Sequence, residues 1–322
     1  MTTEMNRRSF LHMGMSAAAA AVAPRWMNPQ NSGGRAPVSP VDLIAKMRAS
    51  GDSTEIKTTK LYDNVYLLQG AGGNMAAQTG PDGKILIDSS FSTAVPRLRK
   101  ALSELSGDSP HLLINTHWHF DHTEGNEGMH AAGFTILAHS MTRERLSRPS
   151  EIKVIGASFP AAPGAALPTV TFEDKMHLWH NSDTVAITHF SPAHTDTDVC
   201  IHFQKANVLH MGDVWENGFY PGIDESSGGN IDGLIRATEK ALALTGPDTK
   251  IIPGHGPLGT KAQLQATRDM LSTVRERVAK LKAAGASEQE VVARKLTADL
   301  DSTWANGPFP SDMFVGVVYR TL

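Results

Sequence analysis

Histidine and aspartate side chains with the spacing of metal ligands occur together in His117-Trp118-His119-Phe120-Asp121-His122. Residues two apart in an extended chain point to the same side, so His117 and His119 can bind one ion together. A turn after them would present Asp121 and His122 to a second ion. Nitrogen and oxygen donors without a thiolate suit Zn²⁺ and also fit Mn²⁺ or Fe²⁺, whereas so much imidazole disfavours Mg²⁺.

Four ligands are too few for two ions, and three further candidates lie elsewhere in the chain. They are His194 in Ala193-His194-Thr195, Asp213 in Gly212-Asp213, and His255 in Pro253-Gly254-His255-Gly256. Each belongs to a Gly- or Pro-containing segment after a predicted strand, where irregular backbone can bring a ligand into a shared cleft. An isolated histidine is usually a core or surface residue. We accept that interpretation for most of the 14 histidines but expect His194 and His255 to be ligands.

The composition limits the class of protein. The chain has 322 residues, a formal net charge of −3 and 40% hydrophobic residues, which excludes wholesale disorder. A near-neutral charge without a long basic run argues against nucleic acid as a partner. The one cysteine, Cys200, excludes an intrachain disulfide and a Cys-rich metal site, and its strand-like surroundings predict a small core residue.

The elements that must position these ligands follow a pattern that occurs twice. Each half is predicted as strand, turn, strand, a terminal aspartate (Asp88, then Asp213), a helix, and a strand that opens into a histidine loop. This duplication predicts an α/β protein with two sheet-and-helix halves packed face to face. The expected strands are 64–68, 75–79, 84–87, 111–115, 184–188, 199–203, 207–211 and 250–252, and the expected helices are 94–106 and 230–244. A long helix over about 260–284, a capping box at 287–290 and strand character over 314–319 complete the prediction.

The N-terminus has the features of an export signal. Arg7-Arg8 precedes an Ala-rich uncharged stretch from Met13 to Ala23, which resembles a Tat signal peptide, and 28–40 is predicted as a flexible leader. The alternative is a disordered N-terminus that contains arginines by chance. The apolar stretch is about half of the ~20 residues that span a bilayer, so we expect no stable membrane anchor. We therefore expect export by the Tat machinery, a periplasmic or otherwise exported location, and a domain over 41–322 with a helical extension at about 260–300.

Taken together, the motifs resemble a known family. His-x-His-x-Asp-His, Ala-His-Thr, Gly-Asp and Pro-Gly-His-Gly, between about Val65 and Pro257, resemble the motifs of the metallo-β-lactamase-fold hydrolases. The resemblance implies an αββα sandwich with two metal ions at one edge of the sheets. It implies the following roles: His117, His119 and His194 bind metal one, Asp121, His122 and His255 bind metal two, and Asp213 bridges them. Asp88 matches the carboxylate that supports the metal loop from behind, although it could instead only cap a turn.

The activity implied is that of an exported dinuclear zinc hydrolase acting on a small molecule. A metal-bound hydroxide, oriented by Asp121 as the catalytic carboxylate, would open a cyclic amide or ester as a β-lactamase does. Asp213 stands where the best-known zinc β-lactamases carry cysteine, which instead resembles lactonases and the thioesterase glyoxalase II. Two other classes remain open. One is an iron persulfide dioxygenase with one metal held by His117, His119, His194 and Asp213, and the other is a non-catalytic metal-binding accessory protein.

Aromatic residues near the ligands are candidates for substrate contact. Trp215, Phe219 and Tyr220 lie in a Gly- and Pro-containing loop after Asp213, where we expect them to be exposed and to contact substrate. Trp118 and Phe120 alternate with the ligands, so they could equally line a pocket or point into the core. The turn at 225–230 is better explained as the start of the following helix.

Overall fold

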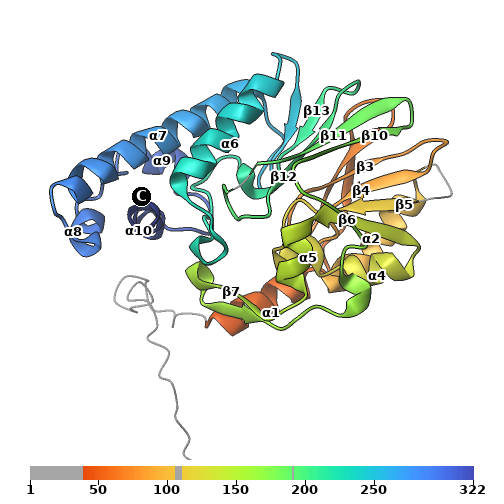
Figure 1. Ribbon diagram of the computed structural model, residues 1–322, viewed down its shortest axis with the longest axis horizontal. Helices are drawn as coiled ribbons and strands as arrows, with labels where there is room; N and C mark the ends of the chain where they lie inside the picture. The colour runs from red at the N-terminus through yellow and green to blue at the C-terminus, as the bar shows by residue number, and fades with distance from the viewer. Residues whose placement is uncertain (1–38, 106–110, 191) are drawn as a thin grey trace, which may run out of the picture. The chain divides into compact units, whose positions relative to one another are not determined.

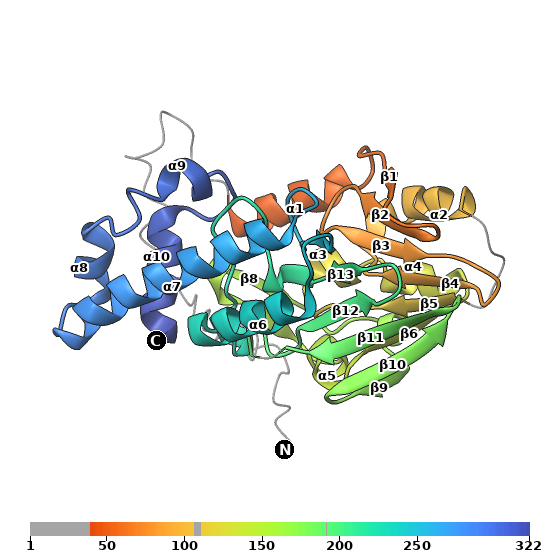
Figure 2. The same ribbon diagram turned by 90° about the horizontal axis from the view of Figure 1, so that it is seen from above.

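The computed structural model describes residues 39–105, 111–190 and 192–322. Two β-sheets face each other, with helices on their outer faces (Figure 1, Figure 2). The first sheet has seven strands in the order β1 (Lys57–Lys60), β2 (Val65–Gln69), β3 (Met75–Gln78), β4 (Lys84–Ile87), β5 (His111–Ile114), β6 (Phe134–His139) and β9 (Val170–Phe172). The second has five, in the order β10 (Lys175–His180), β11 (Asp183–His189), β12 (Val199–Phe203), β13 (Val208–His210) and β14 (Lys250–Ile252). A hairpin of β7 (Ser150–Ile152) and β8 (Ala157–Phe159) lies outside both sheets.

The helices lie between and after these strands. The α-helices are α1 (Pro40–Ser50), α2 (Val95–Ser103), α3 (Phe120–Thr123), α4 (Asn126–Ala131), α5 (Ser140–Leu146), α6 (Ile231–Leu244), α7 (Lys261–Ala283), α8 (Glu288–Ala293), α9 (Asp301–Trp304) and α10 (Ser311–Thr321). The short 3-10 helices are η3 (Ser92–Ala94), η4 (Lys153–Ile155), η5 (Gly164–Ala166), η6 (Gly212–Val214) and η7 (Glu225–Ser227). Within the described residues, none of these helices is long and apolar enough to cross a membrane.

The predicted duplication is confirmed by the strand pairing. In the first half β3 and β4 pair antiparallel, and β4 pairs parallel with β5 after the crossover through α2. In the second half β12 and β13 pair antiparallel, and β13 pairs parallel with β14 after the crossover through α6. Asp88 therefore follows β4 just as Asp213 follows β13. The carboxyl ends of β5, β13 and β14 are the starting points of the histidine- and aspartate-bearing loops.

Successive side chains along a strand point to opposite faces of the sheet and so pack into different layers of the core. In β4, Ile85 and Ile87 pack between the two sheets, whereas Leu86 points to the outer face, where it packs against α2. The core between the sheets also includes Val185 and Ile187 of β11. The outer face of the second sheet contributes Cys200 to a third cluster shared with α6, α7 and the C-terminal helices. These layers make the αββα sandwich, and Cys200 is the buried core residue that its surroundings predicted.

The C-terminal helices extend the sandwich. Helix α7 lies alongside α6, and α8, α9 and α10 gather at its far end (Figure 1). Helix α7 begins at a capping box formed by Thr260 and Gln263, and α8 begins at the predicted box of Ser287 and Glu290. The start of α6 is also as predicted, because Asn230 caps it by accepting a hydrogen bond from the Gly233 amide.

The prediction of a strand over 314–319 is wrong, because this segment lies in helix α10. Its β-branched and aromatic composition favoured a strand. Its buried residues, Phe314 to Val318, pack in α10 among the C-terminal helices α7 and α8, and this tertiary packing overrides the β-propensity. The predicted export signal and nearly all of the predicted leader lie outside the described residues, and the described chain enters α1 at Pro40.

Candidate metal centre

The predicted ligands meet at one end of the sandwich because their strands are parallel neighbours or face each other. His117 follows β5, Asp213 lies in η6 after β13, and His255 follows β14. His194 precedes β12, and Asp121 and His122 belong to the short helix α3. All of them are buried except His255, whose side chain is 28% exposed. His255 therefore marks the side on which solvent reaches the cluster.

The side chains form two groups of potential ligands. The first contains His117, His119, His194 and Asp213, and the second contains Asp121, His122 and His255. Within each group the ligand atoms lie within 4.8 Å of one another. His117 and His119 thus lie in one group and Asp121 and His122 in the other, and Asp213 belongs to the first group.

Asp213 lies between the two groups. Its Oδ2 is 3.8 Å from His117 Nε2 and 3.7 Å from His194 Nε2 in the first group. The same oxygen is 3.5 Å from His255 Nε2, and its Oδ1 is 3.2 Å from His122 Nε2. One carboxylate thus faces imidazole nitrogens of both groups. This is the geometry that a carboxylate bridging two cations requires.

Asp88 holds the loop that carries the histidines. Its carboxylate accepts hydrogen bonds from Thr116 N (2.7 Å), Thr116 Oγ1 (2.7 Å) and His122 Nδ1 (2.8 Å). It is fully buried, and its φ of +61° is a backbone conformation that aspartate and asparagine tolerate better than most residues. Asp88 therefore fixes His122 with Nε2 directed at the cluster, as well as shaping the turn after β4.

The other histidines of the first group are also oriented from outside. His119 Nε2 donates to Asp224 Oδ2 at 3.1 Å, and His194 Nδ1 donates to the Gly222 carbonyl at 2.8 Å. These bonds direct His119 Nδ1 and His194 Nε2 toward each other at 2.9 Å, and in neutral imidazoles both atoms then carry lone pairs. Two lone pairs at that distance repel each other unless a cation lies between them. Outer hydrogen bonds of this kind fix the tautomer and ring direction of metal-binding histidines.

His117 provides a further test of whether a cation fits. Its Nδ1 is 3.0 Å from Thr116 Oγ1, while its Nε2 is buried and makes no hydrogen bond within the described part of the chain. Burial, followed by the charge of His122, lowers the pKa of His117 well below 6.5. A neutral, buried imidazole with a free lone pair is suited to binding a metal ion. The donor set therefore fits a divalent cation.

The charges of the second group support the same conclusion. Burial opposes the charged forms of all these groups, but Asp213 and Asp121 raise the pKa of His122 and of His255 well above 6.5. In turn, His122 and His255 hold the pKa of Asp213 well below 3.8. The ionised carboxylates are thus stabilised by positive charge close to them. A divalent cation would supply that charge and release the protons from the two histidines.

Two glycines allow the loops to approach this closely. A Cβ on Gly73 would lie 2.1 Å from the His122 ring, and a Cβ on Gly254 would lie 1.8 Å from Asp213 Oδ1. Both distances are shorter than real contacts, so any side chain at these positions would displace a potential ligand. Gly254 belongs to the Pro-Gly-His-Gly motif, which explains why glycine precedes His255.

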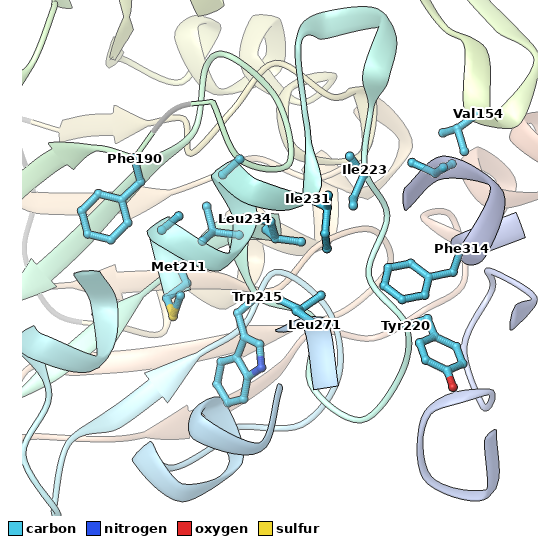
Figure 3. Packing of buried hydrophobic residues seen from close by; sticks show 14 of the residues in the cluster. Val154, Phe190, Met211, Trp215, Tyr220, Ile223, Ile231, Leu234, Leu271 and Phe314 are labelled. Atoms are coloured by element: carbon cyan, nitrogen blue, oxygen red, sulfur yellow. The ribbon is translucent and has the colours of Figure 1, made fainter. Parts of the chain in front are cut away.

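The expectation that Trp215 and Tyr220 are exposed is wrong. Both side chains are fully buried, and Figure 3 shows Trp215 beside Leu271 of α7 and Tyr220 beside Phe314 of α10. Trp215 Nε1 donates to Thr267 Oγ1 at 2.8 Å, and the Tyr220 hydroxyl bonds to Asp301 Oδ1 at 2.9 Å. The C-terminal helices cover the loop that the sequence predicted to be exposed.

Phe219 is the partly buried member of the three aromatic residues, and its ring packs on Gly307 in the segment between α9 and α10. Trp118 and Phe120 are buried, and both side chains lie against the hairpin strand β8 through Phe159.

Asp224 is the site residue that sequence reasoning missed. It lies 105 positions from His119 and directly before the turn at 225–230, where it caps η7 by accepting a hydrogen bond from the Ser226 amide. Burial opposes its ionisation, but the bonds from His119, Ser226 and Ser227 hold its pKa well below 3.8. The local sequence around Asp224 indicates only a helix cap. Its contact with His119 depends on how the fold brings the two segments together.

Comparison with known proteins identifies the family. The family model of the metallo-beta-lactamase superfamily matches residues 60–255, which include every residue of the two ligand groups. The chain belongs to the metallo-beta-lactamase superfamily. Helices α7 to α10 lie beyond the part of the chain that matches this superfamily.

Relatives within the superfamily have varied activities. The chain is 25% identical over 205 residues to acyl-coenzyme A thioesterase MBLAC2 of Homo sapiens, covering 60% of this chain and 72% of the relative. It is 30% identical over 146 residues to hydroxyacylglutathione hydrolase of Nitrosococcus oceani, covering 44% and 47%.

Solved structures share the fold. DIM-1 metallo-beta-lactamase superposes with a TM-score of 0.54 at 20% identity, over 68% of this chain and 98% of the other. The sec-alkylsulfatase Pisa1 from Pseudomonas sp. superposes with a TM-score of 0.63 at 18% identity, over 82% and 50%. Membership of the superfamily and the names of these relatives indicate a metal-dependent hydrolase.

Proposed function

We propose that this chain is a dinuclear zinc hydrolase that cleaves an activated carbonyl compound, with thioesters as its first substrate class. The observation that carries the proposal is the position of Asp213 between the two ligand groups. A site for a single ion would not need Asp121, His122 and His255 on the far side of this carboxylate. The second group is what distinguishes the proposal from an iron-dependent dioxygenase with one metal.

The residues that would hold the ions follow from the two groups. His117, His119 and His194 would hold the first ion, and Asp121, His122 and His255 the second. Asp213 would contact both, because its carboxylate also faces His122 and His255. Imidazole and carboxylate donors without thiolate fit Zn²⁺, which accepts four such ligands. When bound, the ions would polarise the substrate carbonyl and lower the pKa of a coordinated water toward ~7.

Asp121 would orient the attacking water. Its Oδ2 is 3.2 Å from His255 Nε2 and 3.8 Å from His122 Nε2. Burial opposes its ionisation, but His122 and His255 bring its pKa to about 2, so it is a carboxylate at neutral pH. Its contribution is to accept a hydrogen bond and to direct the water toward the carbonyl carbon.

The substrate class rests on the relatives and on Asp213. Acyl-coenzyme A thioesterase and hydroxyacylglutathione hydrolase both cleave thioesters, as their names state. The aspartate at 213, where the resemblance to zinc β-lactamases would call for cysteine, supports the same class. The likeness to β-lactamase structures at 15–20% identity supports the fold alone. A β-lactam, the substrate class that the sequence analysis favours, is therefore the alternative that the experiment tests.

The experiment is a comparison of substrates with the zinc-loaded protein. A short-chain acyl-coenzyme A, S-lactoylglutathione, a γ-lactone and a chromogenic cephalosporin would be assayed at equal concentration, beside Asp213→Asn. We expect thioester hydrolysis that the variant loses. Hydrolysis of the cephalosporin alone would show that the substrate class is β-lactams and not thioesters. A protein that binds zinc and turns over none of the four would be the non-catalytic accessory protein, and iron with O₂ uptake on a persulfide would make it the dioxygenase.

We also propose that the protein is exported through the Tat machinery to the periplasm or beyond. The support is the pair Arg7-Arg8 before the uncharged stretch from Met13 to Ala23. Fractionation of cells that express the full chain and an Arg7→Lys, Arg8→Lys variant tests it. Export of the natural chain and retention of the variant are expected, and equal distribution of the two would contradict the proposal.

A further inference from the structure

The loop that carries His255 is held from the opposite half of the sandwich. Asn74, which directly precedes strand β3 of the first sheet, is buried, and its Nδ2 donates to the carbonyls of Pro253 and Gly256, both at 2.9 Å. Its backbone N–H donates to the carbonyl of Gly254 at 2.7 Å. One residue of the first half therefore binds three of the four carbonyls of this loop, which belongs to the second half.

The fourth carbonyl of the loop also has a partner. The carbonyl of His255 accepts a hydrogen bond from the Asn217 amide at 2.9 Å. Main-chain carbonyls in a largely buried loop are costly to leave unpaired. The four bonds therefore favour the loop conformation in which His255 Nε2 lies 3.2 Å from Asp121 Oδ2 and 3.5 Å from Asp213 Oδ2.

The direction of the Asn74 amide is fixed by a further partner. Its Oδ1 accepts a hydrogen bond from Gln69 Nε2 at 3.2 Å, which leaves both hydrogens of Nδ2 for the two loop carbonyls. An asparagine side chain combines one acceptor with two donors, whereas an aspartate of the same shape has only acceptors when ionised. Of these two residue types, only asparagine satisfies the hydrogen bonds at this position.

Asn74 also reaches the segment that carries Asp213. Its carbonyl accepts a hydrogen bond from His210 Nε2 at 3.1 Å, and His210 Nδ1 accepts one from the Gly212 amide at 3.2 Å. Gly212 directly precedes Asp213, so a second ligand segment of the second half is linked to the same residue. Asn74 therefore contacts both segments that bring ligands from the second half to the candidate metal centre.

The ligands of the first half lie beside the same residue. Gly73, the neighbour of Asn74, donates to the Asp121 carbonyl at 3.1 Å and packs so closely on the His122 ring that no side chain fits between them. We propose that Asn74 is a positioning residue for the second metal ion. By holding the His255 loop, it sets the distance between His255 and the first-half ligands Asp121 and His122. The inference rests on the proposed two-ion site, and it concerns a residue that belongs to neither ligand group.

Asn74→Asp tests the assignment because it keeps the shape and removes both donors. A carboxylate oxygen would face the carbonyls of Pro253 and Gly256, and their repulsion would displace the His255 loop. Competition titration of the full chain with a chromophoric zinc chelator should show the second ion bound about 10- to 100-fold more weakly and the first nearly unchanged. The added negative charge by itself would strengthen cation binding, so a weaker second site reports the change in geometry.

A second variant avoids the buried charge. Asn74→Ala removes the two donors without adding a carboxylate, and it should weaken the second ion in the same direction. It keeps the measurement possible if Asn74→Asp does not fold. Thermal unfolding of each variant shows that the protein remains folded before its zinc affinities are compared.

Asn181 provides a matched control at the other end of the sandwich. It is also a buried asparagine that joins the two halves, since its Nδ2 donates to the Gly83 carbonyl at 3.1 Å and its Oδ1 accepts from the Asp82 amide at 2.9 Å. It precedes β11, and the opposite end of that strand leads to His194. Asn181→Asp should lower the thermal stability, as Asn74→Asp does, and leave both zinc affinities unchanged.

Cobalt gives a readout of the geometry that a loss of stability alone would not change. With two equivalents of Co²⁺ bound, the visible absorption of the second site should change in both Asn74 variants and not in Asn181→Asp, because this absorption depends on the coordination of the ion. Two ions in the natural chain, with unchanged affinity and spectrum of the second site in both Asn74 variants, would overturn this inference alone. Equal weakening of both ions, or the same loss in Asn181→Asp, would also overturn it. A single ion in the natural chain would overturn the two-ion site of the proposed function, and this inference with it.

Discussion

Replacing Asp88 by asparagine should weaken one metal site and leave the other intact. Asparagine tolerates the φ of +61° at this position and keeps one oxygen for the Thr116 amide. Its NH₂ group replaces the oxygen that accepts from His122 Nδ1 at 2.8 Å, so two donors would face each other. His122 must then lose the bond or move its proton to Nε2, the nitrogen that faces Asp213.

The magnitude follows from the bond that is lost. A hydrogen bond to a charged group contributes about 1.5–3 kcal/mol, which corresponds to at least a tenfold change in affinity. Loss of an outer partner of a metal ligand typically costs 10–100-fold in metal affinity. We therefore expect Asp88→Asn to weaken binding of the second zinc ion about 10- to 100-fold. The first ion, held by His117, His119 and His194, should be affected much less.

The assay is a competition titration with a chromophoric zinc chelator that resolves two binding steps. Asp224→Asn is the reciprocal variant, because Asp224 orients His119 and should affect the first ion instead. Asp183→Asn is the matched control, since Asp183 is also buried and accepts a bond from the Lys205 amide at 2.7 Å, in the turn before β13. Unchanged zinc affinities for both Asp88→Asn and Asp224→Asn would refute the reasoning, as would equal loss of both ions in a folded Asp88→Asn protein.

Two further predictions concern residues outside the ligand groups. Tyr220→Phe removes the hydrogen bond from the Tyr220 hydroxyl to Asp301. Urea denaturation should show a free energy of unfolding lower by about 1 kcal/mol, with KM unchanged. A raised KM at unchanged stability would instead show that Tyr220 contacts the substrate. Burial raises the pKa of Asp198 from 3.8 to about 7, so the folded state binds its proton more tightly than the unfolded state. The contribution of Asp198 to stability therefore falls as the pH rises from about 4 to about 7. Asp198→Asn should remove this slope from the pH dependence of urea denaturation, and an unchanged slope would show that Asp198 does not titrate there.

The residues that the structure brings together in the two ligand groups could be selected from the sequence because they lie in short local motifs. Three of the ligand segments directly follow strands β5, β13 and β14, and each strand was recognisable from its apolar run. The parallel pairing of β13 with β14 then places Asp213 and His255 at the same end of one sheet. The repeat of strand, aspartate, helix and strand carried enough information to predict both halves of the sandwich.

Contacts between distant segments could not be predicted in the same way. Asp224 supports His119 only because the loop after Asp213 folds back across the first sheet's histidine loop. Trp215 and Tyr220 are buried because α7 and the C-terminal helices cover their loop. The sequence near these two residues does not indicate that distant helices pack over them. The error over 314–319 has the same cause. The local composition favours a strand, and the helix forms because Phe314 to Val318 pack against α7 and α8, a contact that the local sequence does not indicate.

Anomalous diffraction at the zinc absorption edge, from crystals of the zinc-loaded protein, tests the central claim most directly. The account predicts two zinc peaks per chain, about 3.5–4 Å apart, with the Asp213 carboxylate between them. His117, His119 and His194 should surround one peak, and Asp121, His122 and His255 the other. A single peak, or two peaks of which only one contacts Asp213, would contradict a dinuclear centre built on this aspartate.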